Sequence, residues 1–393
     1  MLDRGLVSSS IDQTLKVWDL FTGEESFTFH DEAAVLCAAF SKDGLRIASG
    51  SEDKTVKFWA PAGHESRTLM QKGSGIRNVT FDHQGRRIAS VDRNTCRVWD
   101  AASGESLLED RRLAGYGANA RIAWAPDGKL LAIGPQIVNA ATREPDGPPL
   151  EDRSALRESR YEGTGTAFSP DGNYLAAVTG KGMVCIWERK TGQCRFKFSE
   201  APEEPFCLAF SRDGKYLAIG GSSREYPLSG LLQIWDIGSQ EIVLSQREFS
   251  QAVFCVSYSP DGKRIAAGSG VLYGGVGSSP SEIRVYDTST NELLYRLRGK
   301  LDRIYSVSFS PDSKRLASAG GGAEQRPPGG FTIWDMRTGL QLAVWPFQST
   351  SVYGVEFSPD GRRLATASAD GTIKIWDGTP LAETPRYEPL PAN

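Results

Sequence analysis

Histidine is scarce in this sequence. Only three of the 393 residues are histidines, and His30, His64 and His83 fall in different predicted loops. Metal-assisted hydrolysis and proton transfer require His, Asp or Glu side chains gathered at one place. The six cysteines include no Cys-x-x-Cys pair, which argues against a zinc knuckle. The sequence therefore predicts no enzyme activity, no catalytic residue, no metal site and no cofactor.

Long apolar runs and an excess of one charge are missing too. No run approaches the ~18 apolar residues that a membrane-spanning helix needs, and the N-terminal MLDRGLVSSS has no apolar signal-peptide core. Lys and Arg number 45 against 48 Asp and Glu, mixed along the chain, for a net charge of −3. Nucleic acids and anionic membranes favour a one-sided basic field. We expect no nucleic-acid partner, no membrane insertion and a cytoplasmic setting.

What the sequence has in abundance is a repeat. An aromatic residue followed by a short polar turn, as in FSPDG, occurs eight times, with successive aromatics 41 to 51 residues apart. Pro presets φ, Asp bonds back to the backbone and Gly accepts a positive φ, so the phrase predicts a hairpin turn between two strands. The copies lie at 40–44, 81–85, 124–128, 168–172, 210–214, 258–262, 309–313 and 357–361.

A second phrase follows each hairpin: a strand ending in Trp-Asp or a close variant. A large ring at one fixed strand position suits a layered core, and it suits a ligand site poorly because each ring falls in a different repeat. One unit is degenerate, with Ile137-Val138-Asn139 in this place. The ring positions are Trp18, Trp59, Trp99, Trp187, Trp235, Tyr286, Trp334 and Trp376.

Three cysteines share one slot of the repeat. Cys37, Cys207 and Cys255 each lie three residues before the aromatic of a turn phrase, and Ser306 takes the same slot in another copy. This pattern predicts a small buried thiol that fills a tight strand position.

Short strands in units of 40 to 50 residues with an aromatic-Asp ending are typical of propeller blades. From about Gly5 to Asp377 the chain resembles the WD-repeat (WD40) family. The turns alone would also suit TolB-type propellers, but the Trp-Asp strand ends favour WD repeats. The resemblance implies an all-β propeller of four-stranded blades. The Gly-His pair of the family is mostly missing, while its turn Asp is present at Asp12, Asp53, Asp92 and Asp370.

The repeat count leaves two architectures open. There are nine Trp-type strand ends but eight inner strands, and the first unit begins at its second strand. We expect an eight-bladed ring with an incomplete N-terminal blade over residues 1–378. The alternative is a seven-bladed ring from about residue 70 that follows two extra units. Pairing the first and last units in one blade would close the ring.

The tail at 379–393 is Pro-rich and predicted to be extended. It looks similar to the exit of WD-repeat regions in large bacterial multidomain signalling proteins. The chain contains no kinase motif and no Walker motif. Those regions are often joined to Ser/Thr kinase or NTPase domains, and any such domain here would have to lie upstream of Met1.

Loop insertions indicate where a partner would bind. Segments 222–231, 268–281 and 320–330 extend the same loop in three consecutive repeats, and 144–163 extends another. By the family geometry all four would project from one face. Drift or duplication of a segment would also explain them, because loop closure entropy grows slowly with length. Tyr and Arg are favoured interface anchors, and the candidates are Arg157, Arg160, Tyr161, Arg224, Tyr226, Tyr273 and Arg326.

Three functions follow from these observations. The first is a protein-binding scaffold that presents loops on one propeller face. The second is a sensory or structural propeller module of a larger bacterial kinase or NTPase-type signalling protein. The third is a metal-dependent propeller hydrolase, which the scattered histidines disfavour.

Overall fold

The computed structural model divides the chain into two compact units, one formed by Met1–Ser66 with Trp376–Asn393 and one by Arg67–Ile375. The description covers residues 5–10, 12–19, 25–30, 34–40, 47–51, 56–59, 65–70, 76–92, 95–110, 121–133, 136–142, 144–151, 165–178, 183–198, 202–223, 229–271, 281–299, 301–321, 329–346 and 351–377. The predicted extended tail, 379–393, lies outside these residues.

The smaller unit contains two three-stranded antiparallel sheets. Their strands are β1 (Gly5–Ser9), β2 (Thr14–Asp19) and β3 (Glu25–His30), then β4 (Val35–Phe40), β5 (Ile47–Ser51) and β6 (Val56–Trp59). In the first sheet β1 pairs directly with the strand that carries Trp18. This is expected for a sequence repeat that starts at its second strand.

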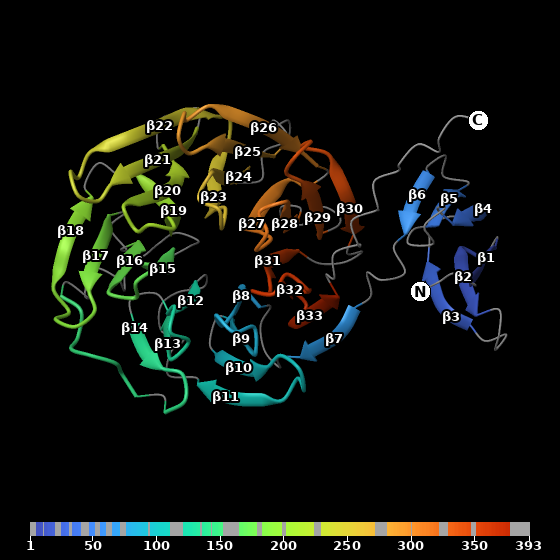
Figure 1. Ribbon diagram of the computed structural model, residues 1–393, viewed down its shortest axis with the longest axis horizontal. Helices are drawn as coiled ribbons and strands as arrows, with labels where there is room; N and C mark the ends of the chain where they lie inside the picture. Colours follow the sequence, from blue (N-terminus) through green and yellow to red (C-terminus); the bar gives the residue numbers. More distant parts are fainter. Residues whose placement is uncertain are drawn as a thin grey trace, which may run out of the picture. The chain divides into compact units, whose positions relative to one another are not determined.

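The larger unit is built of antiparallel sheets in sequence order (Figure 1). Most are four-stranded, and β12–β14 has three strands within the described residues. The strands are β8 (Asn78–Phe81), β9 (Arg87–Val91), β10 (Cys96–Asp100), β11 (Ser106–Asp110), β12 (Ile122–Trp124), β13 (Leu130–Ile133), β14 (Gln136–Asn139), β15 (Thr166–Phe168), β16 (Tyr174–Val178), β17 (Val184–Glu188), β18 (Cys194–Phe198), β19 (Glu204–Phe210), β20 (Tyr216–Ser222), β21 (Gly230–Asp236), β22 (Ile242–Phe249), β23 (Ala252–Tyr258), β24 (Arg264–Gly270), β25 (Glu282–Asp287), β26 (Leu293–Arg298), β27 (Arg303–Phe309), β28 (Arg315–Gly321), β29 (Gly330–Asp335), β30 (Gln341–Pro346), β31 (Val352–Phe357), β32 (Arg363–Ser368), β33 (Thr372–Asp377) and β7 (Glu65–Met70).

The first strand of each sheet lies on the inside of the ring in Figure 1. In the described part of the unit these inner strands neighbour one another in the order β8, β12, β15, β19, β23, β27 and β31, and β31 returns to β8. The expected count of eight blades is not confirmed, and the order of these inner strands is that of the seven-bladed alternative. Two of the sheets are joined by a single pairing, Gly270 with Arg303.

The ring closes on a strand from early in the sequence. The last sheet has the order β31-β32-β33-β7, so β7 supplies its outermost strand. The prediction that two repeats far apart in the sequence share one blade is therefore correct in kind. The shared strand, however, comes from the second sequence repeat and not from the first. This pairing covers the free edge of β33.

The turn phrase forms the hairpin that the sequence predicts. In one copy the Ser211 hydroxyl donates to Asp213 Oδ1 at 2.6 Å, and the Tyr216 N–H donates to Ser211 Oγ at 2.9 Å. Gly214 has φ +71°, and Ser313, which replaces Gly in one copy, takes φ +57°. The Ser and Asp of the phrase thus bond the turn internally, which explains why the phrase recurs without any catalytic role.

Arginines just after these turns connect one blade to the next. Arg315 Nη2 donates to the Gly361 carbonyl at 3.4 Å, and Arg363 Nη2 donates to the Gly85 carbonyl at 2.7 Å. The second bond joins the last blade to the first, so it supports ring closure at the end opposite the starts of the inner strands. The guanidinium of Arg363 also lies over the Phe81 ring, 5.8 Å from its centroid.

The Trp-type rings are core residues in the larger unit, as predicted. Trp99, Trp187, Trp235, Tyr286 and Trp334 are each 5% exposed or less. Trp376 is partly buried, and the side chains of Trp18 and Trp59 lie outside the described residues.

The hydrogen-bond partner of the indole N–H in these rings differs from blade to blade. Trp334 Nε1 donates to Ser318 Oγ at 2.9 Å, and Trp99 makes the same bond to Ser90. Ile219 holds the corresponding place on β20, and there Trp235 Nε1 is buried without a hydrogen-bond partner in the described structure.

Ser318→Ala should therefore destabilise the larger unit. It removes the hydroxyl that accepts the buried indole N–H of Trp334 in the described structure, a loss of about 1 to 3 kcal/mol. Urea unfolding of the full chain measures this, with Ser239→Ala as the control because Ser239 is exposed in a turn. Equal effects of the two variants would contradict the assigned role of the Trp334–Ser318 bond.

Within the described residues, an irregular segment, 144–151, follows the three strands of the degenerate unit. The Asn139 N–H donates to the Glu144 carbonyl at 2.8 Å, and the Asp146 N–H donates to the Ile137 carbonyl at 3.1 Å. Leu150 is buried, and the Glu151 carbonyl accepts the indole N–H of Trp187 at 2.9 Å. The prediction that 144–163 projects from the insertion face is thus wrong for 144–151. These residues lie along the open edge of β14, where their backbone forms hydrogen bonds with that strand.

Candidate functional site

The strand registers locate the loop insertions at one end of the ring. The first residue of an inner strand pairs with the last residue of the second strand, as Glu204 does with Ser222 and Arg303 does with Gly321. The insertions start just after these second strands. We call this end, where the inner strands begin, the insertion end, and the opposite end, with the polar hairpins, the turn end.

The insertions are shorter than the sequence predicted, because the strands reach into them. β24 extends to Gly270, β28 extends to Gly321 and β21 begins at Gly230. A Cβ at Gly320 would lie 2.0 Å from the Arg303 carbonyl oxygen, and one at Gly321 would lie 2.3 Å from Ser351 Oγ. These glycines are therefore needed for close strand approach at the insertion end.

Four consecutive inner strands carry a bulge at the insertion end. The pairing register of β19, β23, β27 and β31 shifts around one residue in each strand, and a β-bulge of this kind re-aims a side chain. That residue is aromatic in all four strands, and we call the set the aromatic arc. It consists of Phe206, Phe254, Tyr305 and Tyr353.

Neighbouring rings of the aromatic arc contact one another. The ring centroids of Phe206 and Phe254 are 5.1 Å apart, those of Phe254 and Tyr305 are 6.4 Å apart, and those of Tyr305 and Tyr353 are 4.9 Å apart. Phe206 and Phe254 are buried, whereas Tyr305 and Tyr353 are partly exposed. The arc therefore has a rigid apolar base and a half that a partner can touch.

Three arginines flank the arc. The Arg77 guanidinium lies 4.5 Å from the Tyr353 ring centroid, and that of Arg303 lies 4.9 Å from the Phe254 centroid. Arg121, just before β12, donates from Nη2 to the Tyr305 carbonyl at 3.0 Å and to that of Phe254 at 3.4 Å. Because β23 and β27 lie across the ring from β12 in Figure 1, Arg121 reaches across the inside of the ring. We call the place where Arg121 meets Phe254 and Tyr305 at the insertion end the channel mouth.

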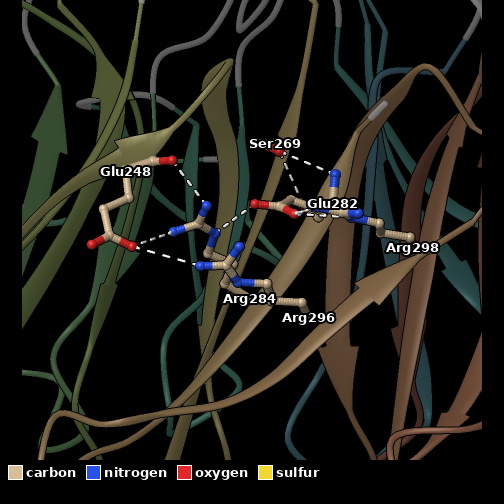
Figure 2. A network of polar contacts seen from close by, with 6 residues as sticks. All are labelled: Glu248, Ser269, Glu282, Arg284, Arg296 and Arg298. Atoms are coloured by element: carbon tan, nitrogen blue, oxygen red, sulfur yellow. Dashed lines mark hydrogen bonds and ion pairs between the residues drawn. The ribbon is translucent and has the colours of Figure 1, made fainter. Parts of the chain in front are cut away.

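The base of one insertion is fixed by a buried ion-pair network (Figure 2). Arg284 Nε and Glu282 Oε1 on β25 are 2.6 Å apart, with both side chains 6% exposed or less. Arg298 Nη2 on β26 lies 3.2 Å from Glu282 Oε2, and Arg284 Nη2 donates to the Glu248 carbonyl of the preceding blade at 2.9 Å. Ser269 Oγ donates to the Glu282 carbonyl at 3.0 Å. The network holds two blades together where the 268–281 insertion starts.

The residues singled out in the sequence have different outcomes. Thr372 N–H donates to Asp370 Oδ1 at 2.8 Å, Thr95 N–H donates to Asp92 Oδ1 at 2.6 Å, and Thr14 N–H donates to Asp12 Oδ1 at 3.0 Å. These aspartates are turn residues, and Asp53 lies outside the described residues. So do all seven predicted contact residues: Arg157, Arg160, Tyr161, Arg224, Tyr226, Tyr273 and Arg326.

Sequence reasoning missed the aromatic arc, although a signal was present. Each member lies four residues before the aromatic of a turn phrase, and Arg77 takes the same position before Phe81. A comparison of the repeats at that position finds an aromatic residue in each of the last four, and Arg77 lies in the repeat that follows Tyr353 around the ring.

The predicted buried thiols are found in the larger unit only. Burial raises the pKa of the Cys255 thiol to about 12 and raises that of Cys207 further. Both are thus unreactive fillers beneath the arc. Cys37 is exposed, so the prediction is wrong there. In the described part of the chain, no group of three or more His, Cys, Asp or Glu side chains is placed to hold a metal ion.

One carboxyl group lies between two inner strands. Glu356 on β31 accepts hydrogen bonds on Oε1 from the Thr80 hydroxyl at 3.2 Å and from the Phe81 N–H at 3.3 Å, both on β8. Loss of hydration raises the pKa of Glu356 to about 8, although these two bonds lower it in part. Among the described residues no cation compensates this group.

Glu356→Gln should stabilise the ring at pH 8 more than at pH 5. A carboxyl with a raised folded pKa contributes its full stability below the unfolded pKa of about 4.3 and loses it as the pH rises to about 8. The amide cannot ionise, so the variant removes this loss. Melting temperatures of both proteins between pH 4 and 9 measure the effect, and parallel curves would contradict it.

Comparison with known proteins agrees with the repeat architecture. The family model "WD domain, G-beta repeat" matches residues 23–60, 63–100, 164–188, 241–270, 291–323 and 339–377, together more than half of the chain. The chain belongs to the WD40 repeat family. Two of these matches span β7 and β33, the strands that close the ring, so closure is made within WD40 units.

Several curated proteins are similar over part of the chain. THO complex subunit 3 of Arabidopsis thaliana is 26% identical over 211 residues, which cover 51% of this chain and 62% of that protein. Serine-threonine kinase receptor-associated protein of Gallus gallus is 22% identical over 47% of this chain and 64% of its own length. Apoptotic protease-activating factor 1 of Rattus norvegicus is 34% identical over 33% of this chain and 11% of its own length.

The chain thus matches less than two thirds of the length of each of these proteins. All three are eukaryotic, so the similarity to bacterial WD-repeat regions is not supported. Among the described residues, no helix is long and apolar enough to cross a bilayer.

Proposed function

We propose that this WD40 chain is a protein-binding scaffold that holds its partner at the insertion end of the ring. The observation that carries the proposal is the aromatic arc, which joins partly exposed tyrosines to a buried aromatic base at the end where the insertions start. Tyrosine and arginine are enriched among the residues that dominate binding energy. Aromatic side chains also lose little conformational entropy on binding.

The fold supports such a role by holding the arc rigid. Each arc residue lies on a strand, not on a loop, and Arg121 bonds across the channel mouth to the backbone of two of them. A partner would therefore meet a preorganised surface and would lose less free energy on binding. The insertions, with their Tyr and Arg residues, would add contacts around this centre.

The test uses the full chain and its cellular partners. Proximity labelling is compared for the wild type, a Tyr305→Ala/Tyr353→Ala variant and a control variant at the turn end, Lys263→Ala/Arg362→Ala, whose two residues are exposed. We expect specific proteins to be lost from the tyrosine variant alone. A labelled set unchanged by the tyrosine variant, or lost equally from the control, would refute binding at the insertion end.

One observation supports a second function, that of a module in a larger signalling protein. The match to apoptotic protease-activating factor 1 covers 11% of that protein, so similar repeats occur inside a much longer chain. Reading the coding sequence upstream of Met1 tests this. An in-frame kinase or NTPase domain would support the module, and a stop codon directly upstream would exclude it.

The remaining expectations belong to the same proposal. The scaffold acts without catalysis or cofactor, in the cytoplasm, on protein partners and not on nucleic acid. The thiols of Cys207 and Cys255, free and buried, support a reducing compartment.

A further inference from the structure

Two of the three arginines that flank the aromatic arc, Arg77 and Arg121, have no acidic partner among the described residues. In the described structure the Arg77 guanidinium makes one contact, its stacking on Tyr353, and its Nε is buried without a hydrogen-bond partner. The Arg121 guanidinium bonds to two backbone carbonyls and, within the described part of the chain, to no carboxylate. Both side chains are partly exposed. Two positive charges are therefore partly desolvated at the channel mouth, and no described carboxylate compensates them.

Several other partly or fully buried arginines are paired with a carboxylate, as Arg284 is with Glu282, Arg97 with Glu109 and Arg87 with Asp82. Arg315 and Arg363 at the turn end instead bond to backbone carbonyls, but neither has a buried nitrogen without a hydrogen-bond partner as Arg77 has. Desolvation of an unpaired charge costs free energy, and a ligand carboxylate would offset that cost. A guanidinium whose face stacks on a ring still presents its N–H edge to a planar anion.

We propose that the channel mouth binds an acidic peptide segment of the partner, with Arg77 and Arg121 as the groups that receive a Glu or Asp carboxylate. This inference rests on the proposed function and names its ligand class. Tyr305 and Tyr353 contact the residues next to the carboxylate. Arg77 donates from its terminal nitrogens, and Arg121 donates from the nitrogens that the carbonyls leave free.

The site fits an acidic peptide better than a nucleic acid. Nucleic-acid binding depends on many phosphate contacts along a basic track, whereas the chain has a net charge of −3 and this positive group is confined to the channel mouth. One or two carboxylates between arginine and tyrosine side chains match its extent. Binding should weaken as salt rises, because the charges are partly exposed.

Fluorescence anisotropy with defined peptides tests the proposal on the full chain. The probes are labelled 12-residue Gly-Ser-Tyr peptides that carry four Glu, four Gln or four phosphoserine residues, and a labelled 12-nucleotide single-stranded RNA. We expect the Glu peptide to bind at least ~10-fold more tightly than the Gln peptide. Arg77→Met and Arg121→Met should each abolish most of this difference, while Arg77→Lys should retain part of it.

Arg362→Met is the matched control, because it removes an exposed arginine at the turn end. Melting curves of all variants show whether the fold is intact, and Arg77→Lys keeps the test valid if the methionine variants unfold. Equal binding of the Glu and Gln peptides, or equal losses in the control, would overturn the proposal. Tighter binding of the phosphoserine peptide or of the RNA through the same arginines would overturn it in favour of that ligand.

The outcome separates this inference from the proposed function. If the tyrosine variant loses its labelled partners while Arg77→Met and Arg121→Met keep them, the insertion end binds protein and the acidic ligand is wrong. If the tyrosine variant loses nothing, binding at the insertion end itself is wrong.

Discussion

Gly320→Ala should lower the free energy of unfolding by about 3 kcal/mol or more, a large effect for a single methyl group. The new Cβ would lie 2.0 Å from the Arg303 carbonyl oxygen and 3.2 Å from Leu301 Cδ1. Real Cβ atoms do not approach a backbone oxygen so closely, so β27 must shift along with the residues that follow Arg303. Urea unfolding of the full chain measures the loss.

The same shift should disturb the aromatic arc, because Tyr305 lies two residues after Arg303. We therefore expect Gly320→Ala to lose labelled partners even at temperatures where it is folded. Gly299→Ala is the matched control, since its Cβ would meet its nearest neighbours at 3.9 Å. If both variants unfold at the same urea concentration as the wild type, the strands are not as closely apposed as described.

Glu282→Ala should also cause a large loss in the free energy of unfolding. It would leave Arg284, whose side chain is 5% exposed, without its closest anionic partner, and an uncompensated buried charge costs about 3 to 5 kcal/mol. Burial by itself raises the pKa of Glu282, but Arg284 and Arg298 offset this and hold it below its usual range. The stabilising ion pair is therefore present above the ordinary carboxyl pKa and is lost as the pH falls below about 4.

Two comparisons sharpen the test of this ion pair. Arg337→Ala removes a pair whose arginine is 75% exposed, and it should cost at most about 1 kcal/mol. A Glu282→Leu/Arg284→Met double variant removes both buried charges and should recover much of the stability lost in Glu282→Ala. If the double variant is less stable than Glu282→Ala, the instability of Glu282→Ala does not come from the uncompensated charge of Arg284.

Local features of the fold were predictable because each depends on a few adjacent residues. The Ser-x-Asp-Gly hairpins bond within the turn phrase itself, and the buried Trp rings follow from their fixed strand position. Ring closure was not predictable in detail. β7 has the same local pattern whether it completes its own sheet or pairs with β33, and only the three-dimensional arrangement decides between them.

The site was harder to predict for a physical reason. The aromatic arc combines residues from four blades, and a bulge in each strand turns them to the same end. A bulge leaves little trace in a sequence, and Arg121 gains its role only by reaching the backbone of strands more than 130 residues away. The length of the loop insertions singled out Tyr226 and Arg326 in the sequence. The aromatic arc is found only when one position is compared across all the repeats.

The strand that closes the ring also has a consequence for biosynthesis. Met70, at the end of β7, leaves the ribosome about 300 residues before Thr372, where its partner β33 begins. At about 5 to 20 residues per second, the nascent chain spends about 15 to 60 s with β7 unpaired. During that interval the exposed strand can pair with other nascent chains, so the newly made protein should depend on chaperones until its last repeat is synthesised.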